Sequence, residues 1–111
     1  MRKAAPPREI PPPLELECLK ILWSLGEGRV HDVRTSLGTA RELKYTTVMT
    51  VLDRLARRGA ASRRKAGRSF IYRPLLAADA LQALALREFV DRYFGGSPQE
   101  LTKYLATYCM E

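Results

Sequence analysis

The stretch YTTVMTVLDRL, residues 45–55, decides the fold of this chain. Its apolar residues recur at the spacing of one helix face, namely Val48, Val51, Leu52 and Leu55. Polar side chains project from the rest of the cylinder: Thr46, Thr47, Thr50, Arg54 and Arg57. We therefore predict a helix that begins near residues 45–47, where a threonine can cap the exposed amides, and that runs to Arg58 before Gly59.

An arginine-rich hairpin pattern follows this helix directly. Residues 61–65 (ASRRK) and 69–73 (SFIYR) are short extended runs on either side of a turn at Gly67. Phe70 and Tyr72 are expected to share a face, because side chains alternate along a strand. Four basic residues lie on the first strand of the hairpin and at its turn, namely Arg63, Arg64, Lys65 and Arg68. Such cations repel one another unless an anion lies nearby, so the pattern predicts a wing that meets an anion.

Two further helices are predicted upstream. The first runs from Leu14 to a stop at Gly26, with Leu19, Leu22, Trp23 and either Leu16 or Cys18 facing the core. After a brief extended segment at residues 28–30, a second helix covers residues 31–37 and buries Val33 and Leu37. Three helices followed by a hairpin form a winged helix-turn-helix, so the predicted fold class is mainly α with a small β-hairpin wing, in residues 14–75.

The N-terminal residues 1–13 contain five of the seven prolines, together with Arg2, Lys3 and Arg8. Proline of this density prevents a helix or a central strand. We expect a flexible basic arm, which is either a disordered terminus or a source of additional phosphate contacts.

Charge is divided unevenly along the chain. Residues 1–74 hold 16 lysines and arginines against 7 acidic residues, whereas residues 75–111 hold 3 against 5. The basic excess therefore belongs to the predicted winged helix, as expected of a surface that binds DNA. A helix with hydroxyls at its start and arginines at its end can reach base edges first and phosphates later.

The C-terminal residues 76–111 are predicted to form a helical dimerisation region. One helix is expected over residues 77–94, and a second follows Ser97-Pro98-Gln99-Glu100, which supplies an N-cap, a proline at the first helical position and a glutamate three residues after the cap. Their apolar stripes exceed what a helix beside a small domain hides easily. The alternative is that both stripes pack back on the winged helix. The predicted dimer residues are Leu81, Leu84, Phe89, Val90, Tyr93, Phe94, Leu101, Tyr104, Leu105 and Tyr108.

Catalytic and metal chemistry find no support in the residue pattern. His31 is the single histidine, and Cys18 and Cys109 form no ligand cluster, so no enzyme, metal site or cofactor is expected. Both cysteines are expected to be ordinary buried thiols. No signal peptide or membrane span is recognised, which makes the cytoplasm the expected location.

The residues in combination resemble the penicillinase repressors of the BlaI/MecI type, a family that includes copper-responsive relatives. The likeness is carried by LELECLKILW at 14–23, YTTVMTVLDRL at 45–55, Gly67-Arg68 with Phe70, Tyr72 and Pro74, and FGGS at 94–97. The resemblance implies a cytoplasmic homodimeric repressor on a dyad-symmetric operator, with β-lactam-resistance or cell-envelope genes among its targets. It implies base reading by Thr46, Thr47, Met49 and Thr50. Contacts with the DNA backbone and in the wing would come from Lys44, Tyr45, Arg54, Arg63, Arg64, Lys65 and Arg68.

The resemblance weakens toward the C-terminus. Family members induced by antibiotic sensing share a cleavage region around an Asn-Phe pair, but residues 103–106 read KYLA, which leaves a regulatory protease an open question. Copper-responsive members share a cysteine-rich motif that a solitary Cys109 does not match. Two alternatives stay open: an architectural DNA binder without sequence preference, and a winged-helix module that binds protein.

Overall fold

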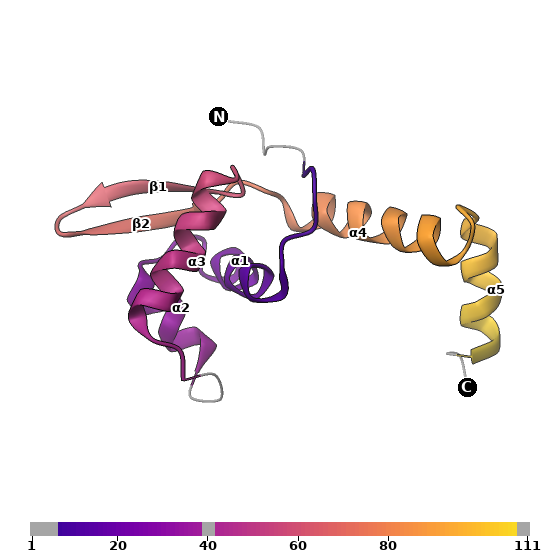
Figure 1. The fold of residues 1–111 in the computed structure, drawn as a ribbon, viewed down its shortest axis with the longest axis horizontal. Helices are drawn as coiled ribbons and strands as arrows, with labels where there is room; N and C mark the ends of the chain where they lie inside the picture. Colours follow the sequence, from indigo (N-terminus) through magenta and orange to yellow (C-terminus); the bar gives the residue numbers. More distant parts are fainter. Residues whose placement is uncertain (1–6, 39–41, 109–111) are drawn as a thin grey trace.

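The computed structural model describes residues 7–38 and 42–108. Its elements are helices α1 (Pro13–Leu25), α2 (Val30–Leu37) and α3 (Tyr45–Arg57), strands β1 (Ala61–Ala66) and β2 (Ser69–Pro74), and helices α4 (Ala78–Tyr93) and α5 (Pro98–Tyr108). The first three helices pack together beside the hairpin, and α4 leads away from them to α5 at the far end (Figure 1). The predicted fold class, a winged helix followed by C-terminal helices, is confirmed.

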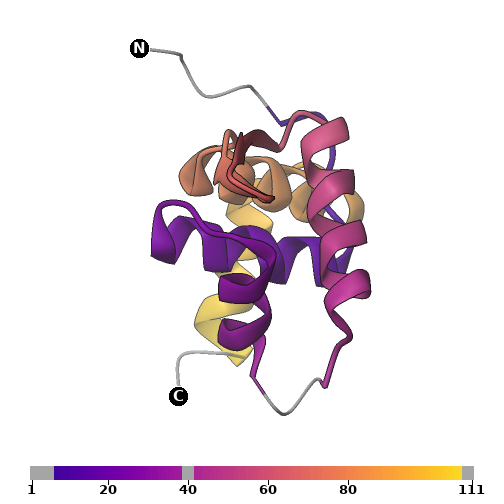
Figure 2. The same ribbon diagram turned by 90° about the vertical axis from the view of Figure 1, so that its left-hand side faces the viewer.

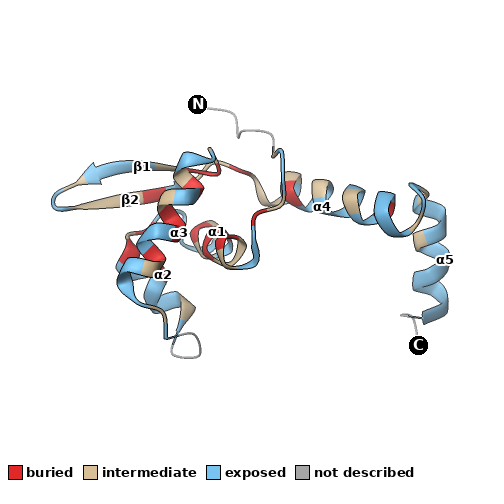
Figure 3. Ribbon diagram, in the orientation of Figure 1, coloured by how far each residue is buried: buried red, intermediate tan, exposed pale blue. Residues whose placement is uncertain are grey.

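The core lies where α1, α2, α3 and the hairpin meet, because each contributes one apolar stripe (Figure 3). The predicted face of α3 is fully buried or nearly so at Val48, Val51, Leu52 and Leu55. From α1 come Cys18, Leu19 and Leu22, with Leu16 and Trp23 partly buried against them. The indole Nε1 of Trp23 donates a hydrogen bond to the Leu76 carbonyl at 2.8 Å, which ties the start of the C-terminal region to α1.

Strands β1 and β2 pair in antiparallel register, with Arg63 opposite Tyr72 and Lys65 opposite Phe70. Gly67 has φ +69, the conformation that a tight turn needs and that glycine adopts without strain. Gly28 exchanges two backbone hydrogen bonds with Tyr72, at 3.0 and 2.8 Å, on the other side of β2. The loop between α1 and α2 therefore holds the wing along its second edge, as the predicted extended segment at residues 28–30 allows.

The C-terminal helices extend beyond the body of the winged helix. The radius of gyration is 16.7 Å, compared with about 13 Å for a compact domain of this length. The predicted helix start is confirmed, since the Glu100 amide donates to Ser97 Oγ at 3.3 Å and Pro98 is the first residue of α5. Cys109 lies outside the described residues.

Several sequence predictions are corrected by the structure. Helix α2 begins at Val30, one residue early, because the Arg29 amide donates to the Asp32 carboxylate at 2.9 Å and closes the first turn. Helix α3 has Lys44 at its N-cap and no side-chain cap, so the threonines do not cap it.

The predicted flexible arm is packed on the domain over part of its length. Pro11 is buried, Ile10 packs against the core, and Pro13 already belongs to α1. Arg58 at the end of α3 forms ion pairs with Glu9 at 3.4 Å and with the buried Glu15 at 3.6 Å. Residues 1–6, with Arg2 and Lys3, lie outside the described part.

Candidate nucleic-acid interface

The face of α3 opposite the core is exposed and polar. Thr46, Met49, Thr50, Arg54 and Arg57 are exposed on it, and Thr47 is partly exposed at its side. The Thr50 hydroxyl donates to the Thr46 carbonyl at 2.9 Å, which leaves its oxygen free to accept from a ligand. Because no threonine is used as a cap, the hydroxyls near the start of α3 stay available at the surface.

The start of α3 is fixed by the preceding helix. The Arg34 Nε group on α2 donates to the Leu43 carbonyl at 2.8 Å, two residues before α3 begins. Lys44 and Tyr45 follow directly and are exposed. This contact sets how the N-terminal turn of α3 is presented relative to α2, the geometry on which groove reading by a helix-turn-helix depends.

Asp53 joins the recognition face of α3 to the wing. Its Oδ1 atom accepts from the Tyr72 hydroxyl at 2.7 Å and from Arg63 Nη1 at 3.0 Å. The Arg63 guanidinium also lies over the Phe70 ring, 4.1 Å from its centroid, so it is held by a charge and by an aromatic face. Burial of the Tyr72 ring, followed by its hydrogen bond to Asp53, raises the pKa of Tyr72 to about 12.

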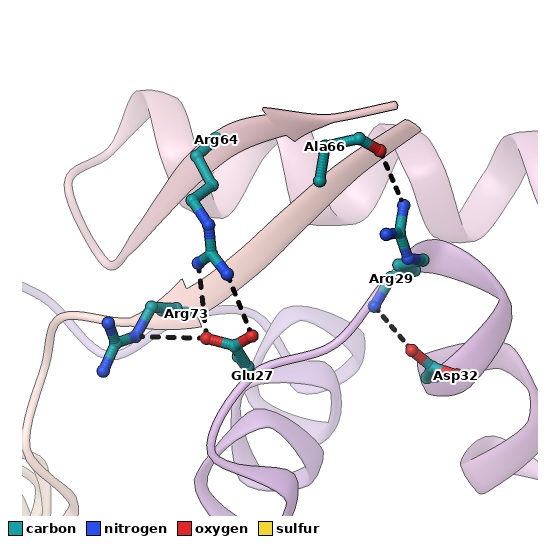
Figure 4. Close-up of polar contacts among 6 residues, drawn as sticks. All are labelled: Glu27, Arg29, Asp32, Arg64, Ala66 and Arg73. Atoms are coloured by element: carbon teal, nitrogen blue, oxygen red, sulfur yellow. Dashed lines mark hydrogen bonds and ion pairs between the residues drawn. The ribbon is translucent and has the colours of Figure 1, made fainter. Parts of the chain in front are cut away.

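The opposite face of the wing is held by the loop between α1 and α2 (Figure 4). The Glu27 carboxylate accepts from Arg64 at 3.3 and 3.1 Å and lies 3.7 Å from Arg73 Nε. The hydrogen bond from Arg64 lowers the pKa of Glu27 below its ordinary value. Arg29 Nη1 donates to the Ala66 carbonyl at 3.0 Å, near the tip of the hairpin.

These contacts correct the inference that the wing charges need an external anion. Asp53 and Glu27 supply two internal carboxylates, and these pair with Arg63, Arg64 and Arg73. Other predicted contact residues form no ion pair with any other residue that the structure describes, namely Lys44, Arg54, Lys65 and Arg68. The cations most available to a polyanion therefore lie at the start of α3, on its flank and toward the tip of the wing.

The view along the wing places it beside α3 rather than behind it (Figure 2). Strand β1 contacts α3 directly through Arg63 and Asp53. The predicted base-reading and wing residues thus belong to two elements that contact each other within the winged helix.

Comparison with known proteins assigns this arrangement to a family. The sequence profile described as "Penicillinase repressor" matches residues 12–109. The chain belongs to the penicillinase repressor family. The resemblance stated from the sequence is therefore confirmed.

Two relatives give the extent of the likeness. The penicillinase repressor of Bacillus licheniformis is 28% identical over 83 residues, which cover 75% of this chain and 65% of that protein. The transcriptional regulator BlaI of Mycobacterium tuberculosis is 39% identical over 71 residues, which cover 63% of this chain and 51% of that protein. The chain thus spans about half to two thirds of the length of these relatives.

A solved structure supports the fold. The solution structure of the DNA binding domain of the repressor BlaI matches with a TM-score of 0.56 and 29% identity, and the match covers 67% of this chain and 93% of that domain. Within the described residues of this penicillinase repressor homologue, no helix is both long enough and apolar enough to cross a membrane.

The C-terminal helices of this family member leave a large apolar surface uncovered. A continuous series of aromatic rings runs over α4 and α5, with centroid separations between 4.5 and 5.7 Å: Phe89, Tyr93, Phe94, Tyr104 and Tyr108. Leu86 and Tyr93 are 54% and 71% exposed. Leu81 and Leu84, predicted as dimer residues, instead pack against the winged-helix core, because the first turns of α4 lie on it. Val90 is also buried.

Sequence reasoning missed Asp53, Glu27 and Arg29 as residues that position the wing. Glu27 and Arg29 flank a glycine in a loop, and nothing in their local pattern indicates that the loop pairs with a strand more than forty residues later. The sequence carried a signal for one of these contacts. Asp32 stands three residues after Arg29, and this spacing is typical of an acidic side chain that accepts a hydrogen bond from the N-cap amide.

Proposed function

We propose that this chain is a dimeric, sequence-specific DNA-binding repressor that acts at a dyad-symmetric operator. The observation that carries the proposal is the joint placement of the exposed threonine face of α3 and the basic wing on one domain, from which an apolar helix pair projects. The family assignment supports it, since one relative is called a repressor and another a transcriptional regulator.

Base reading is assigned to Thr46, Thr47, Met49 and Thr50. Threonine can donate to or accept from base edges, and its methyl group, like the Met49 side chain, can pack on thymine. Lys44, Tyr45 and Arg54 flank this stripe and are exposed. They are proposed to contact the phosphates that border the groove, which gives affinity and orientation without sequence information.

The wing is proposed to contribute mainly through Lys65 and Arg68. Both are exposed, and neither forms an ion pair with another described residue. Arg63 and Arg64 already pair with carboxylates of the protein. Each can contact DNA only if its guanidinium binds the carboxylate and a phosphate together, or if it leaves the carboxylate. The existing ion pairs reduce the contribution of these two arginines to DNA binding. They do not abolish it, because exchange of an exposed ion pair costs little free energy.

Dimerisation is proposed to use the uncovered surface of α4 and α5, with the second copy of the chain as partner. The exposed set is smaller than the sequence indicated, because Leu81 and Val90 are buried within the chain and Leu84 is partly buried against the core. Two copies related by a two-fold axis would present two α3 helices to two half-sites, and repression would follow from occupancy of the promoter.

The test is selection of bound sequences from a random duplex pool by the purified protein at near-physiological salt. Enrichment of an inverted repeat is the expected result. It would provide the operator with which to find the genes, beginning with those for β-lactam resistance and the cell envelope. Retention of DNA without enrichment would favour the architectural binder, and no retention would favour a protein-binding module.

A further inference from the structure

A hollow of about 340 Å³ lies between the end of α3 and the first half of β1. Its lining residues are Asp53, Ala56, Arg57, Ala61, Ser62 and Arg63. Asp53 and Arg57 follow Thr46 and Thr50 at steps of four, three and four residues, so all four lie on one stripe of α3. The hollow is therefore continuous with the face assigned to base reading.

Two arginines border this hollow from different elements. Arg57 on α3 is exposed and forms no ion pair with any residue in the described ranges. Arg63 on β1 is held in place by Asp53 through Nη1 and by the Phe70 ring. The hydrogen bond to Asp53 uses Nη1, one of the three nitrogens of the guanidinium, so the group can bind a further acceptor without loss of that contact.

This arrangement suits an anionic group with several oxygen acceptors, such as a phosphate. A guanidinium fixed in orientation loses little freedom on binding, and its planar donors match phosphate oxygens. Asp53 would repel an anion if it were unpaired, but its Oδ1 atom already accepts from Tyr72 and Arg63. Ser62 adds a hydroxyl donor at the rim.

We propose that this hollow binds one phosphate of the DNA backbone, with Arg57 and Arg63 as its two cationic ligands. The inference rests on the proposed function, since it requires that the chain binds a duplex. It adds Arg57 to the DNA-contacting residues. It also sets how far the backbone contact lies from the threonines along α3, since Thr46 and Arg57 are about 16 Å apart at the rise of an α-helix.

The first experiment measures the salt dependence of binding to a fluorescein-labelled duplex of random sequence. The variants are Arg57→Gln, Arg63→Gln and the double variant, and the matched controls are Arg87→Gln and Arg92→Gln on α4, which remove the same charge from exposed positions. Neutralising one phosphate contributes about 0.9 to the slope of log K against log salt. Because both arginines share one phosphate, the double variant should lower the slope by about 0.9 in total.

Each alternative result overturns the shared site. A double variant that lowers the slope by about 1.8 would mean that the arginines contact two different phosphates. Variants that bind like the α4 controls would mean that neither contacts DNA. Wild-type protein that retains no duplex at low salt would remove the proposed function and this site together, whereas normal wild-type binding with unchanged variants removes this site alone.

The second experiment separates a contact from a folding effect and locates the phosphate. Arg57→Lys and Arg63→Lys keep the charge and should retain the salt slope, which a loss of structure would not do. On a selected operator, replacing single phosphates by neutral methylphosphonates should reveal one position in each half-site that weakens wild-type binding. The double variant should be indifferent to that position while it stays sensitive to the others, and equal sensitivity at every position would refute the assignment.

Discussion

The winged helix and the C-terminal helix pair differ in how far their apolar residues are buried. Leu52 and Leu55 on α3 are fully buried, while the opposite face of the same helix carries exposed threonines and arginines. On α4, Leu86 and Tyr93 stay largely exposed, and none of the described residues of α5 is buried. A stripe is buried within one chain only where a second layer is available, and beyond Leu84 Val90 is the one buried residue of α4. The first region is therefore complete in one chain, and the second leaves the apolar surface on which the proposed dimer rests.

The strongest test of this contrast is truncation of a core leucine. Leu52→Ala should lower the free energy of unfolding by about 2–5 kcal/mol, because it removes buried methyl groups and leaves a cavity. Leu86→Ala on α4, measured at a concentration where the chain is monomeric, should change it by less than about 0.5 kcal/mol. Urea denaturation followed by circular dichroism measures both. A similar loss in the two variants would mean that the regions do not differ.

The next test addresses the proposed partner of α4 and α5. Leu86→Lys with Tyr93→Lys places two charges on side chains that are already exposed in the monomer. We expect the dimer to be weakened by about 2 kcal/mol or more, since apolar anchors at an interface carry most of its energy. Sedimentation velocity reports the change in the monomer-dimer equilibrium.

The matched control for this pair is Ser24→Lys on α1 with Ser36→Lys on α2, which adds the same charge at two exposed positions. It changes charge at two exposed positions of the compact region and should leave the sedimentation coefficient unaltered. If both double variants sediment like the wild type, α4 and α5 do not form the interface.

How far the sequence predicts the molecule depends on the range of the interaction. The stripe at residues 48–55 and the cap at Ser97 were read correctly, because helical periodicity and capping act within a few residues. The roles of Asp53 and Glu27 depend on pairs separated by 19 and 37 residues, which only the folded chain brings together. The burial of Leu81 in the core of its own chain could not be predicted for a related reason, since an apolar stripe that packs within one chain and one that packs on a partner have the same sequence pattern.

A smaller effect on stability is expected where α3 contacts the wing. Tyr72→Phe removes the hydroxyl that donates to Asp53 and should lower stability by about 1 kcal/mol near neutral pH. The raised pKa of Tyr72, about 12, adds a pH signature. Since the folded state disfavours the phenolate, stability present below pH 10 is lost as the pH rises toward 12. The wild type should lose more stability over this range than Tyr72→Phe, and identical alkaline limbs would contradict the raised pKa.

The smallest effect on stability is expected on the outer face of the wing. Glu27 is exposed there, and its ion pairs are screened by solvent. Arg64 holds the pKa of Glu27 below its ordinary value of 4.5, so the charged form is favoured in the folded state. Its contribution is present above the unfolded pKa and is lost as the pH falls through the lower, folded pKa. Glu27→Gln should therefore melt at a slightly lower temperature than the wild type at pH 7, and the two should converge in acid. Glu88→Gln on α4 removes the same charge away from the wing and should follow the wild type at every pH. Equal melting temperatures of Glu27→Gln and the wild type at pH 7 would show that the carboxylate adds nothing to the Gly28 backbone pairing.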